Sequence, residues 1–338
     1  MQIFLDSFGA FLGVKNQVFC VKPKDKPERT FSLVQVKAFF VTKGINISSD
    51  ALFLALQHDI PIILLNRIGH PVGQVWSGKY GSISTIRKHQ TLWAMHENGI
   101  AWVCKTLALK IRRQADNLSL LRESVQQNDT LRMATNRANA VLERQIDTLN
   151  DFKPYHLQSK NDDLAQLRGI EGTASAAYFR VIAKVLPAPF FFSVRTRNPA
   201  TDPFNATLNY TYGILYAMVE LALIKAGLDP AIAVMHADRH NHNTMVFDAI
   251  EPYRAWADIV VCNLFLNQKL DAESFYSDNE KNAVYLQSAA RQAVVGAFLE
   301  YLNETTLYTD GQQRKRSSQI DFDAVSLANQ LKNSNYEH

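Results

Sequence analysis

The sequence predicts an α+β multidomain protein, with a small β-rich N-terminal domain over residues 1–82 and a larger all-α domain over residues 83–338. Two observations predict this fold class. Short β-branched and aromatic runs, separated by turn residues, fill the chain up to the Gly-rich segment 69–82. Beyond that segment apolar residues recur at helical spacing, and no proline occurs from 72 to 153. A chain of 338 residues is long enough for two such domains.

In the N-terminal domain, five short runs are rich in β-branched and aromatic residues and are predicted to be strands. They cover residues 2–6, 10–14, 17–21, 30–36 and 38–42. SSDALFLALQHD (48–59) follows as a helix with Ser48 or Ser49 as its N-cap, and PIILLN (61–66) as a buried strand.

In the second domain, residues 84–150 are predicted to be helical, and the polar stretch 118–149 is typical of one long solvated helix or two. Further helices are predicted from the apolar spacing. They cover about 171–185, 205–227, 252–267 and 282–302, with a last one around 321–331.

Composition and cysteine usage limit the class of protein. The net charge of +4 and pI of about 8.8 permit nucleic acid as a partner. Three cysteines far apart argue against a disulfide framework or a thiolate zinc site and fit a reducing cytoplasm. The N-terminus is a poor signal peptide because Asp6 interrupts its apolar run. The apolar stretch 208–228 contains Glu220 and Lys225, so we expect a buried helix and no membrane association.

Candidate site residues gather in MHADRHNHNTMVFDAIEPYR (235–254). His236 ends an apolar segment. Asp248 and Glu251 would share one face of a helix over 246–260, provided that Pro252 lies in its first turn. Far upstream, Glu171 lies beside a run of small residues that would let a helix or a ligand approach closely, and a charge buried there needs a cation as partner.

One imidazole and two or three carboxylates suit Mg²⁺ or Mn²⁺ and a site that polarises phosphate. Other interpretations remain open at this point. The acids near a helix start are commonly solvated or capping, His236 could be a hydrogen-bonded core histidine, and Glu171 could pair with an arginine. Zinc held by His236 and His240, or by His240 and His242, is a further alternative, but it needs a third and a fourth ligand and no cysteine lies nearby.

Four segments in this order resemble the CRISPR-associated protein 1 family. They are GIEG with the small residues after it, RTRNPATDPFNATLNYTYGIL (195–215), His236 with Arg239, and FDAIEPYR (247–254). The resemblance extends over nearly the whole chain. It implies metal ligands at Glu171, His236 and Glu251 and an auxiliary acid at Asp248. His240 and His242 inherit no role from it.

The resemblance also implies a function. The expected protein is a metal-dependent DNA endonuclease and integrase of CRISPR adaptation that joins spacer 3′ ends to the repeat array by transesterification. Its partners would be double-stranded and branched DNA, a second copy as a homodimer, and a small second adaptation protein. Two such dimers would flank a central dimer of that small protein, and the N-terminal domain would serve dimerisation and partner contacts.

Basic residues spread over the helical domain are candidates for DNA backbone contacts. They are Lys79, Arg87, Lys88, Lys110, Arg112, Arg113, Arg239, Arg254 and the run 314–316. The alternative function is a catalytically silent DNA-end-binding scaffold in which ion pairs hold Glu171 and Glu251.

Overall fold

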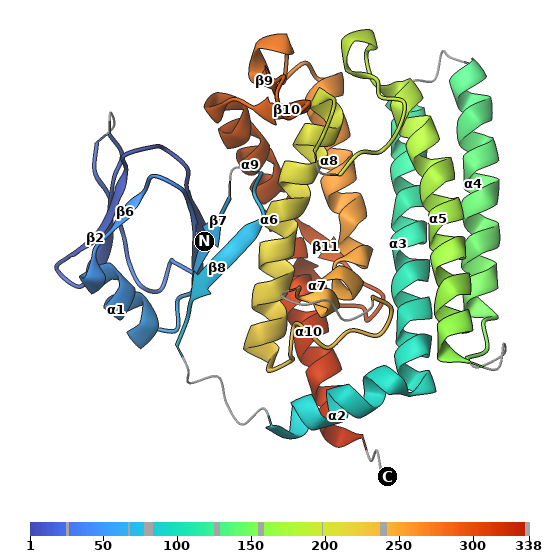
Figure 1. Cartoon of the computed structure of the whole chain (residues 1–338), viewed down its shortest axis with the longest axis horizontal. Helices are drawn as coiled ribbons and strands as arrows, with labels where there is room; N and C mark the ends of the chain where they lie inside the picture. Colours follow the sequence, from blue (N-terminus) through green and yellow to red (C-terminus); the bar gives the residue numbers. More distant parts are fainter. Residues whose placement is uncertain are drawn as a thin grey trace.

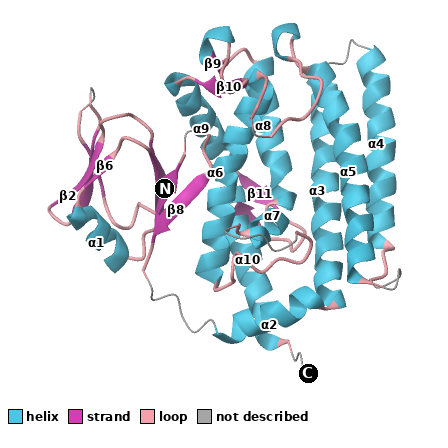
Figure 2. Cartoon of the chain, viewed as in Figure 1, coloured by secondary structure: helices cyan, strands magenta, loops and turns pink. Residues whose placement is uncertain are grey.

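The computed structural model describes residues 1–24, 27–66, 68–77, 84–124, 129–154, 159–197, 199–236 and 242–334. It has a β-rich N-terminal part followed by a helical part, as predicted (Figures 1 and 2). The domain boundary predicted at residue 82 falls within residues 78–83, outside the described residues.

Two four-stranded sheets and one helix form the N-terminal part. The first sheet has the order β1-β5-β7-β8, parallel except for the antiparallel pair β7–β8. The second has the order β4-β3-β2-β6, in which only β2–β6 is parallel. The bounds are β1 Gln2–Leu5, β2 Phe11–Lys15, β3 Val18–Lys22, β4 Arg29–Phe31, β5 Ala38–Thr42, β6 Asn46–Ile47, β7 Ile62–Leu65 and β8 Pro71–Val75. Helix α1 (Ser49–Gln57) begins after Ser48, whose side chain accepts a hydrogen bond from the amide of Ala51.

The first sheet belongs to two hydrophobic cores, because successive side chains of a strand point to opposite faces. Phe39 and Ile62 pack toward the second sheet and α1. Their neighbours Phe40 and Ile63 pack into the core of the helical part. The sheet is therefore a shared layer between the two parts of the molecule (Figure 1).

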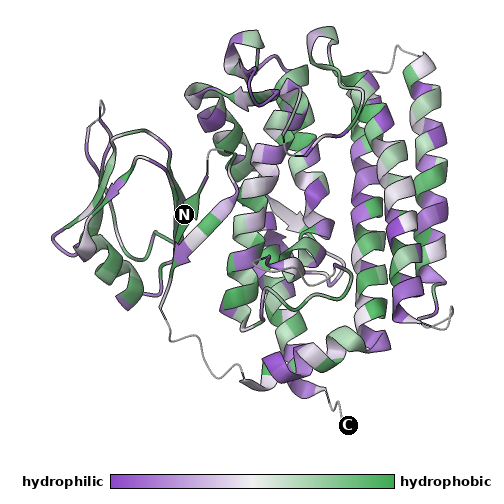
Figure 3. Cartoon of the chain, viewed as in Figure 1, coloured by the Kyte–Doolittle hydropathy of each residue, from purple (hydrophilic) through white to green (hydrophobic). Residues whose placement is uncertain are grey.

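The helical part surrounds one long buried helix, α6. Hydrophobic residues predominate in the C-terminal half of α6 in Figure 3, and most residues of the whole helix are buried, whereas hydrophilic and apolar residues alternate around α4 at the edge. The helices are α2 Ser84–Met95, α3 Glu97–Ser124, α4 Asp129–Asn150, α5 Lys160–Val185, α6 Pro203–Ala226, α7 Thr244–Ala249, α8 Arg254–Leu266, α9 Ser288–Asn303 and α10 Arg316–Asn333. Short 3₁₀ helices are η1 Ala188–Phe190, η2 Glu251–Tyr253 and η3 Ala272–Ser274; two hairpins pair β9 Phe275–Asp278 with β10 Ala283–Leu286 and β11 Thr305–Leu307 with β12 Gln313–Lys315.

A glycine contact joins α6 to the loop between β7 and β8. A Cβ atom on Gly213 would lie 2.5 Å from the carbonyl carbon of Gly69, so only glycine permits this approach. No helix in the described part of the chain is long and apolar enough to cross a membrane.

Several predicted elements differ from the structure. Only the start of the run 30–36 forms a strand, and β8 was not predicted within the Gly-rich segment. Helix α5 begins at Lys160 rather than near 171, so Glu171 lies in mid-helix. Residues 283–286 form a strand ahead of α9.

Candidate active site

A cavity of about 1190 Å³ opens beside α5 in the helical part. Its walls come from α3, α5, α6, the 191–197 segment and the region from α7 to the start of α8. All three residues that the resemblance implies as metal ligands, Glu171, His236 and Glu251, line it. Gly172, Ser175 and Ala176 line it too, so the small-residue face of α5 leaves room there for a ligand, and a Cβ on Gly172 would meet nothing within 4 Å.

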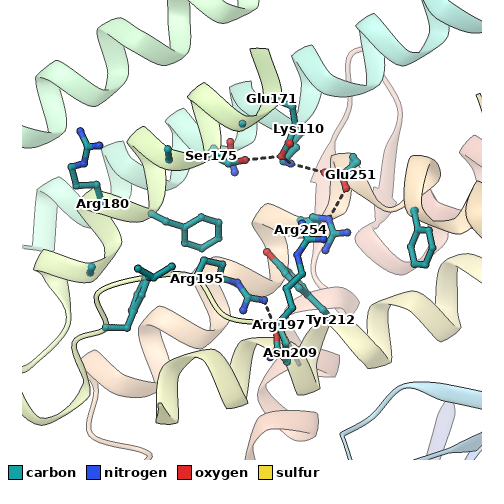
Figure 4. A pocket seen from close by; sticks show the side chains of 18 of the residues that line it. Lys110, Glu171, Ser175, Arg180, Arg195, Arg197, Asn209, Tyr212, Glu251 and Arg254 are labelled. Carbon is teal, nitrogen blue, oxygen red and sulfur yellow. Dashed lines mark hydrogen bonds and ion pairs between the residues drawn. The ribbon is translucent and has the colours of Figure 1, made fainter. Parts of the chain in front are cut away.

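Two of the implied ligands meet on a buried lysine (Figure 4). Lys110 lies on the apolar stripe of α3 that also carries Leu107 and Ile111, and its side chain is only 5% exposed. Its ammonium donates a hydrogen bond to Glu171 Oε1 from α5. The same nitrogen lies 2.6 Å from Oε2 of Glu251 in η2. One cation thus holds two carboxylates that are 80 residues apart in sequence.

The carboxylates have further partners that keep them ionised. Arg254 Nε donates to Glu251 Oε1 at 2.8 Å, and Ser175 Oγ donates to Glu171 Oε1 at 2.8 Å. Burial opposes ionisation of Glu251, but Arg254 and Lys110 outweigh it and lower its pKa to about 2. Burial also opposes ionisation of Glu171, whose pKa is nevertheless lowered, chiefly by Lys110. The pKa of Lys110 is raised because Glu251 and Glu171 outweigh its burial.

His236 is oriented by Asp248. Its Nδ1 lies 2.6 Å from Asp248 Oδ1, and the same carboxylate accepts backbone N–H bonds from Val234 and Met235, both at 2.8 Å. Among the described residues only Nδ1 of the His236 ring forms a hydrogen bond, so Nε2 remains available to a ligand. Asp248 is 1% exposed and does not line the cavity. It is therefore a positioning residue.

The helix predicted over 246–260 is wrong in one respect. The chain forms α7, a 3₁₀ turn and then α8, because Pro252 lacks the amide hydrogen that a continuous helix needs. Asp248 therefore lies near the end of α7 rather than at a helix start. Instead of sharing one face, Asp248 contacts the 234–236 backbone and Glu251 contacts Lys110 and Arg254.

The donor atoms suit a hard divalent cation, but a lysine lies between the two carboxylates. Two carboxylates and one imidazole are the mixed set that Mg²⁺ or Mn²⁺ accepts. Glu251 Oε2 is buried and faces the Lys110 ammonium at 2.6 Å, so a metal ion could bind it by replacing that cation. In the described part of the chain, no three His, Cys, Asp or Glu side chains are grouped to hold a metal ion as they stand. No such group forms around His236 and His242, two of the histidines considered for zinc. The third, His240, lies outside the described residues.

Cationic side chains dominate the cavity wall. Seven lysine and arginine residues line it, against two carboxylates. The seven are Lys110, Arg168, Arg180, Lys184, Arg195, Arg197 and Arg254. Because Lys110 and Arg254 neutralise the two carboxylates, the other five leave the cavity positive and suited to a polyanion.

The predicted DNA contacts have mixed positions. Lys88 and Arg112 are exposed, and Arg87 lies 4.0 Å from Asp229. Lys79 and Arg239 lie outside the described residues. Arg254 lines the cavity but is bound to Glu251.

Two of the residues predicted to contact DNA bind other groups of the protein in this structure. Lys110 is buried between the carboxylates, and Arg113 donates to the carbonyl of Pro252 and lies over the ring of Trp256. In the run 314–316, Arg314 pairs with Asp310 and Arg316 with Glu304.

The cations of α5 and of the 191–197 segment were not predicted from the sequence. Arg180 and Lys184 lie one turn apart in the C-terminal half of α5, where they line the cavity beside Phe179 and Ala183. Arg195 is anchored by bonds to Asn205 Oδ1 at 2.8 Å and Asn209 Oδ1 at 2.6 Å (Figure 4). The sequence could have identified Lys110 as a site residue, because it lies on an apolar stripe of a helix and a buried charge there needs a partner.

Known proteins resemble this chain in sequence and in fold. It is 28% identical over 318 residues to a protein of Archaeoglobus fulgidus named CRISPR-associated endonuclease Cas1 1, covering 91% of this chain and 90% of that protein. A protein of the same name from Thermodesulfovibrio yellowstonii is 25% identical over 89% of this chain and 91% of its own length.

Three solved structures share the fold. A Cas1 protein from Thermotoga maritima matches with a TM-score of 0.75 and 19% identity over 99% of this chain and 98% of that one. A casposase bound to integration product matches with a TM-score of 0.82 and 19% identity over 99% and 92%. A chain of a Cas6-RT-Cas1–Cas2 complex matches with a TM-score of 0.77 and 21% identity over 98% of this chain and 35% of that one. The family model described as CRISPR associated protein Cas1 matches residues 3–300, and the chain therefore belongs to the Cas1 family.

Proposed function

We propose that this chain is a metal-dependent DNA endonuclease and integrase that joins the 3′ ends of spacer DNA to a CRISPR repeat array. The observation that carries the proposal is the convergence of Glu171, Glu251 and His236 on one strongly cationic cavity. The names of the relatives support it: curated relatives are called CRISPR-associated endonucleases, and one structural neighbour is a casposase bound to integration product.

Glu171, His236 and Glu251 would hold Mg²⁺ or Mn²⁺. The bound ion supplies Lewis-acid stabilisation of charge on the phosphate oxygens. Asp248 holds the imidazole so that Nε2 faces the ligand, a second interaction that orients a ligating histidine. Ser175 and Arg254 hold the carboxylates, and the cavity cations bind and orient the DNA phosphates.

The proposed reaction is a transesterification. The terminal 3′-oxygen of the spacer forms a bond to the repeat phosphorus and loses its proton, while the bond from that phosphorus to the repeat 3′-oxygen breaks and the leaving oxygen gains a proton. With water in place of the 3′-hydroxyl, the same site would hydrolyse branched DNA.

We further propose that the partners include a second copy of this chain and the small second adaptation protein, with two dimers flanking its central dimer. A Cas6-RT-Cas1–Cas2 complex among the structural neighbours supports a partner of that kind.

The test is product formation from branched DNA, and from spacer DNA with a repeat-bearing plasmid, in Mn²⁺ or Mg²⁺. We expect products that disappear with chelator and in His236→Ala, and no joined product from spacer ends carrying a 3′-dideoxynucleotide. His242→Ala is the matched control, because His242 lies outside this cavity. Equal products with chelator, or full activity of His236→Ala, would exclude the proposal.

A second candidate function is a catalytically silent scaffold that binds DNA ends. One observation favours it: Lys110 and Arg254 already neutralise both carboxylates. DNA binding by a protein that yields no metal-dependent product would favour this alternative.

A further inference from the structure

We propose that Lys110 is a stand-in cation, which holds Glu171 and Glu251 together before metal loading and thereby couples divalent-cation binding to DNA binding. This inference rests on the proposed function, because it concerns the metal that those carboxylates would hold. It assigns to Lys110 a positioning role that acts through the two carboxylates.

Lys110 joins two elements of the site. Its ammonium contacts a carboxylate of α5 and a carboxylate of η2 at once, so a side chain of α3 joins these two elements. The contact to Glu251 Oε2 at 2.6 Å is an ion pair at hydrogen-bond distance, and the ammonium is the cation that faces this oxygen. Another cation placed there could replace the ammonium on it.

The charges of the side chains in this cluster balance one another. Two carboxylates face two cations, Lys110 and Arg254, so the cluster is neutral before any metal binds. A divalent cation on the same oxygens would lie a few ångströms from the ammonium, and this repulsion is large in a buried site. The ammonium must therefore leave the carboxylates as the metal enters.

The displaced ammonium can move toward the interior of the cavity. Lys110 lines the cavity, and its flexible four-carbon stem allows the nitrogen to turn toward the cavity interior. The other cavity cations already make that space positive, so the displaced ammonium is stabilised there only when DNA phosphates are present. Metal and DNA should consequently bind cooperatively, with Lys110 as the link.

The experiment measures Mn²⁺ affinity directly, by calorimetry and by the electron paramagnetic resonance signal of free Mn²⁺. It uses the full chain, with and without branched DNA whose 3′ ends are dideoxy-terminated. The variants are Lys110→Met, Lys110→Arg and, as matched control, Lys105→Met, which removes an exposed lysine of the same helix. Thermal unfolding with and without Mn²⁺ is followed in parallel.

We expect DNA to tighten Mn²⁺ binding to the wild type by about tenfold, within the usual range of coupling between sites. Without DNA, Lys110→Met should bind Mn²⁺ about tenfold more tightly than the wild type, and DNA should add little. Its melting temperature should fall without Mn²⁺ and rise more than that of the wild type when Mn²⁺ is added. Lys110→Arg and Lys105→Met should keep the dependence on DNA.

If Lys110 only stabilises the fold, the Mn²⁺ affinities will differ from those expected above. If Lys110→Met binds Mn²⁺ no more tightly than the wild type, the stand-in role is wrong. If Lys110→Met does not fold, the wild type still decides, because Mn²⁺ affinity unchanged by DNA overturns the coupling. A wild type that binds no Mn²⁺ with or without DNA overturns the proposed function as well, so the two failures are distinguishable.

Discussion

Asp248 has no exposed surface to offer a substrate, yet its carboxylate organises the segment that carries His236. Both oxygens accept hydrogen bonds from the backbone of residues 234–236, and one also contacts the imidazole. A buried acceptor with several donors is expensive to alter, because each donor left without a partner loses about 1–3 kcal/mol. The aspartate therefore determines both the loop conformation and which imidazole nitrogen faces the cavity.

Asp248→Asn tests this role. Asparagine presents an NH₂ group where one carboxylate oxygen accepted hydrogen bonds, so we expect a loss of about 1–3 kcal/mol in the free energy of unfolding. Loss of the charge that orients the imidazole should weaken Mn²⁺ binding about 10–100-fold. Urea denaturation and Mn²⁺ titration measure the two effects.

The matched control is Asp271→Asn at the N-cap of η3, where one oxygen accepts the hydrogen bonds from Ser274 and asparagine keeps that oxygen. It should leave Mn²⁺ affinity and stability near those of the wild type. Unchanged Mn²⁺ affinity in Asp248→Asn would remove Asp248 from the site.

The pairing of α6 with α8 contains a second buried acid. Tyr212 of α6 donates a hydrogen bond to Asp258 Oδ1 of α8 at 2.6 Å, and the other oxygen accepts none from the described residues. Burial raises the pKa of Asp258 to about 6, against the stabilising effects of Tyr212 and of nearby cations. The charged form of Asp258 thus weakens the packing of two helices that form the cavity wall.

This shift predicts a pH dependence with a definite sign. A carboxyl whose pKa is higher in the folded than in the unfolded protein binds its proton more tightly when folded. The contribution of Asp258 to the free energy of unfolding is therefore fully present below about pH 4 and decreases as the pH rises toward 6. Above pH 6 this contribution is absent.

Asp258→Asn cannot ionise, so its stability relative to the wild type should rise by about 3 kcal/mol between pH 4 and pH 7, from about two pKa units at 1.36 kcal/mol each. Urea midpoints at several pH values measure the difference. Curves that run parallel across this range would contradict the assignment.

At the level of elements, helices and strands with a local signal in the sequence were predicted, and those that depend on pairing or packing with distant residues were missed. Ser48 caps α1 as expected, and the runs at 2–6 and 38–42 form strands because their apolar residues fill two buried faces. β8 was missed because Pro71 and Gly73 are typical of turns, and only its pairing with β7 makes it a strand. The first turns of α5 were missed because they are largely polar and owe their helical state to the Ser159 cap and to packing.

Residues of the site were predictable only where they lie in short sequence motifs. Glu171, His236, Asp248 and Glu251 were identified as candidates from local spacing and the family resemblance. The Lys110 contacts were not, because three elements from distant parts of the chain converge on that nitrogen. The cavity cations of α5 and of the 191–197 segment have no local signature that separates them from solvated arginines.

For the whole molecule, the shared sheet means that the helical part does not have an independent core. Ala38, Phe40, Ile63 and Leu65 of the N-terminal part belong to the same buried cluster as the helices. A chain beginning at Ser84 would expose the surface these residues cover, at about 1.5–3 kcal/mol for each large side chain. We expect such a fragment to unfold at lower urea concentration than the full chain and to bind a hydrophobic dye.

The control for this prediction is Phe53→Ala in the full chain, since Phe53 is 65% exposed. It should unfold near the wild-type midpoint. A fragment from Ser84 that unfolds cooperatively at the full-chain midpoint would show that the two parts are independent.

The charge of the cavity determines how the whole protein should respond to salt. Each phosphate that a cation neutralises releases counterions, so the logarithm of DNA affinity falls linearly with that of salt concentration, by about 0.9 per contact on duplex DNA.

Arg180 and Arg197 are exposed, line the cavity and come from different elements (Figure 4). The double variant Arg180→Gln/Arg197→Gln should weaken binding and reduce the slope by about 1.8, measured by fluorescence anisotropy in chelator so that no reaction intervenes. Arg132→Gln on α4, whose arginine pairs with Asp129 outside this cavity, should keep the wild-type slope. A double variant with the wild-type slope would mean that DNA phosphates do not enter this cavity, because two of its exposed cations would then contribute nothing to counterion release.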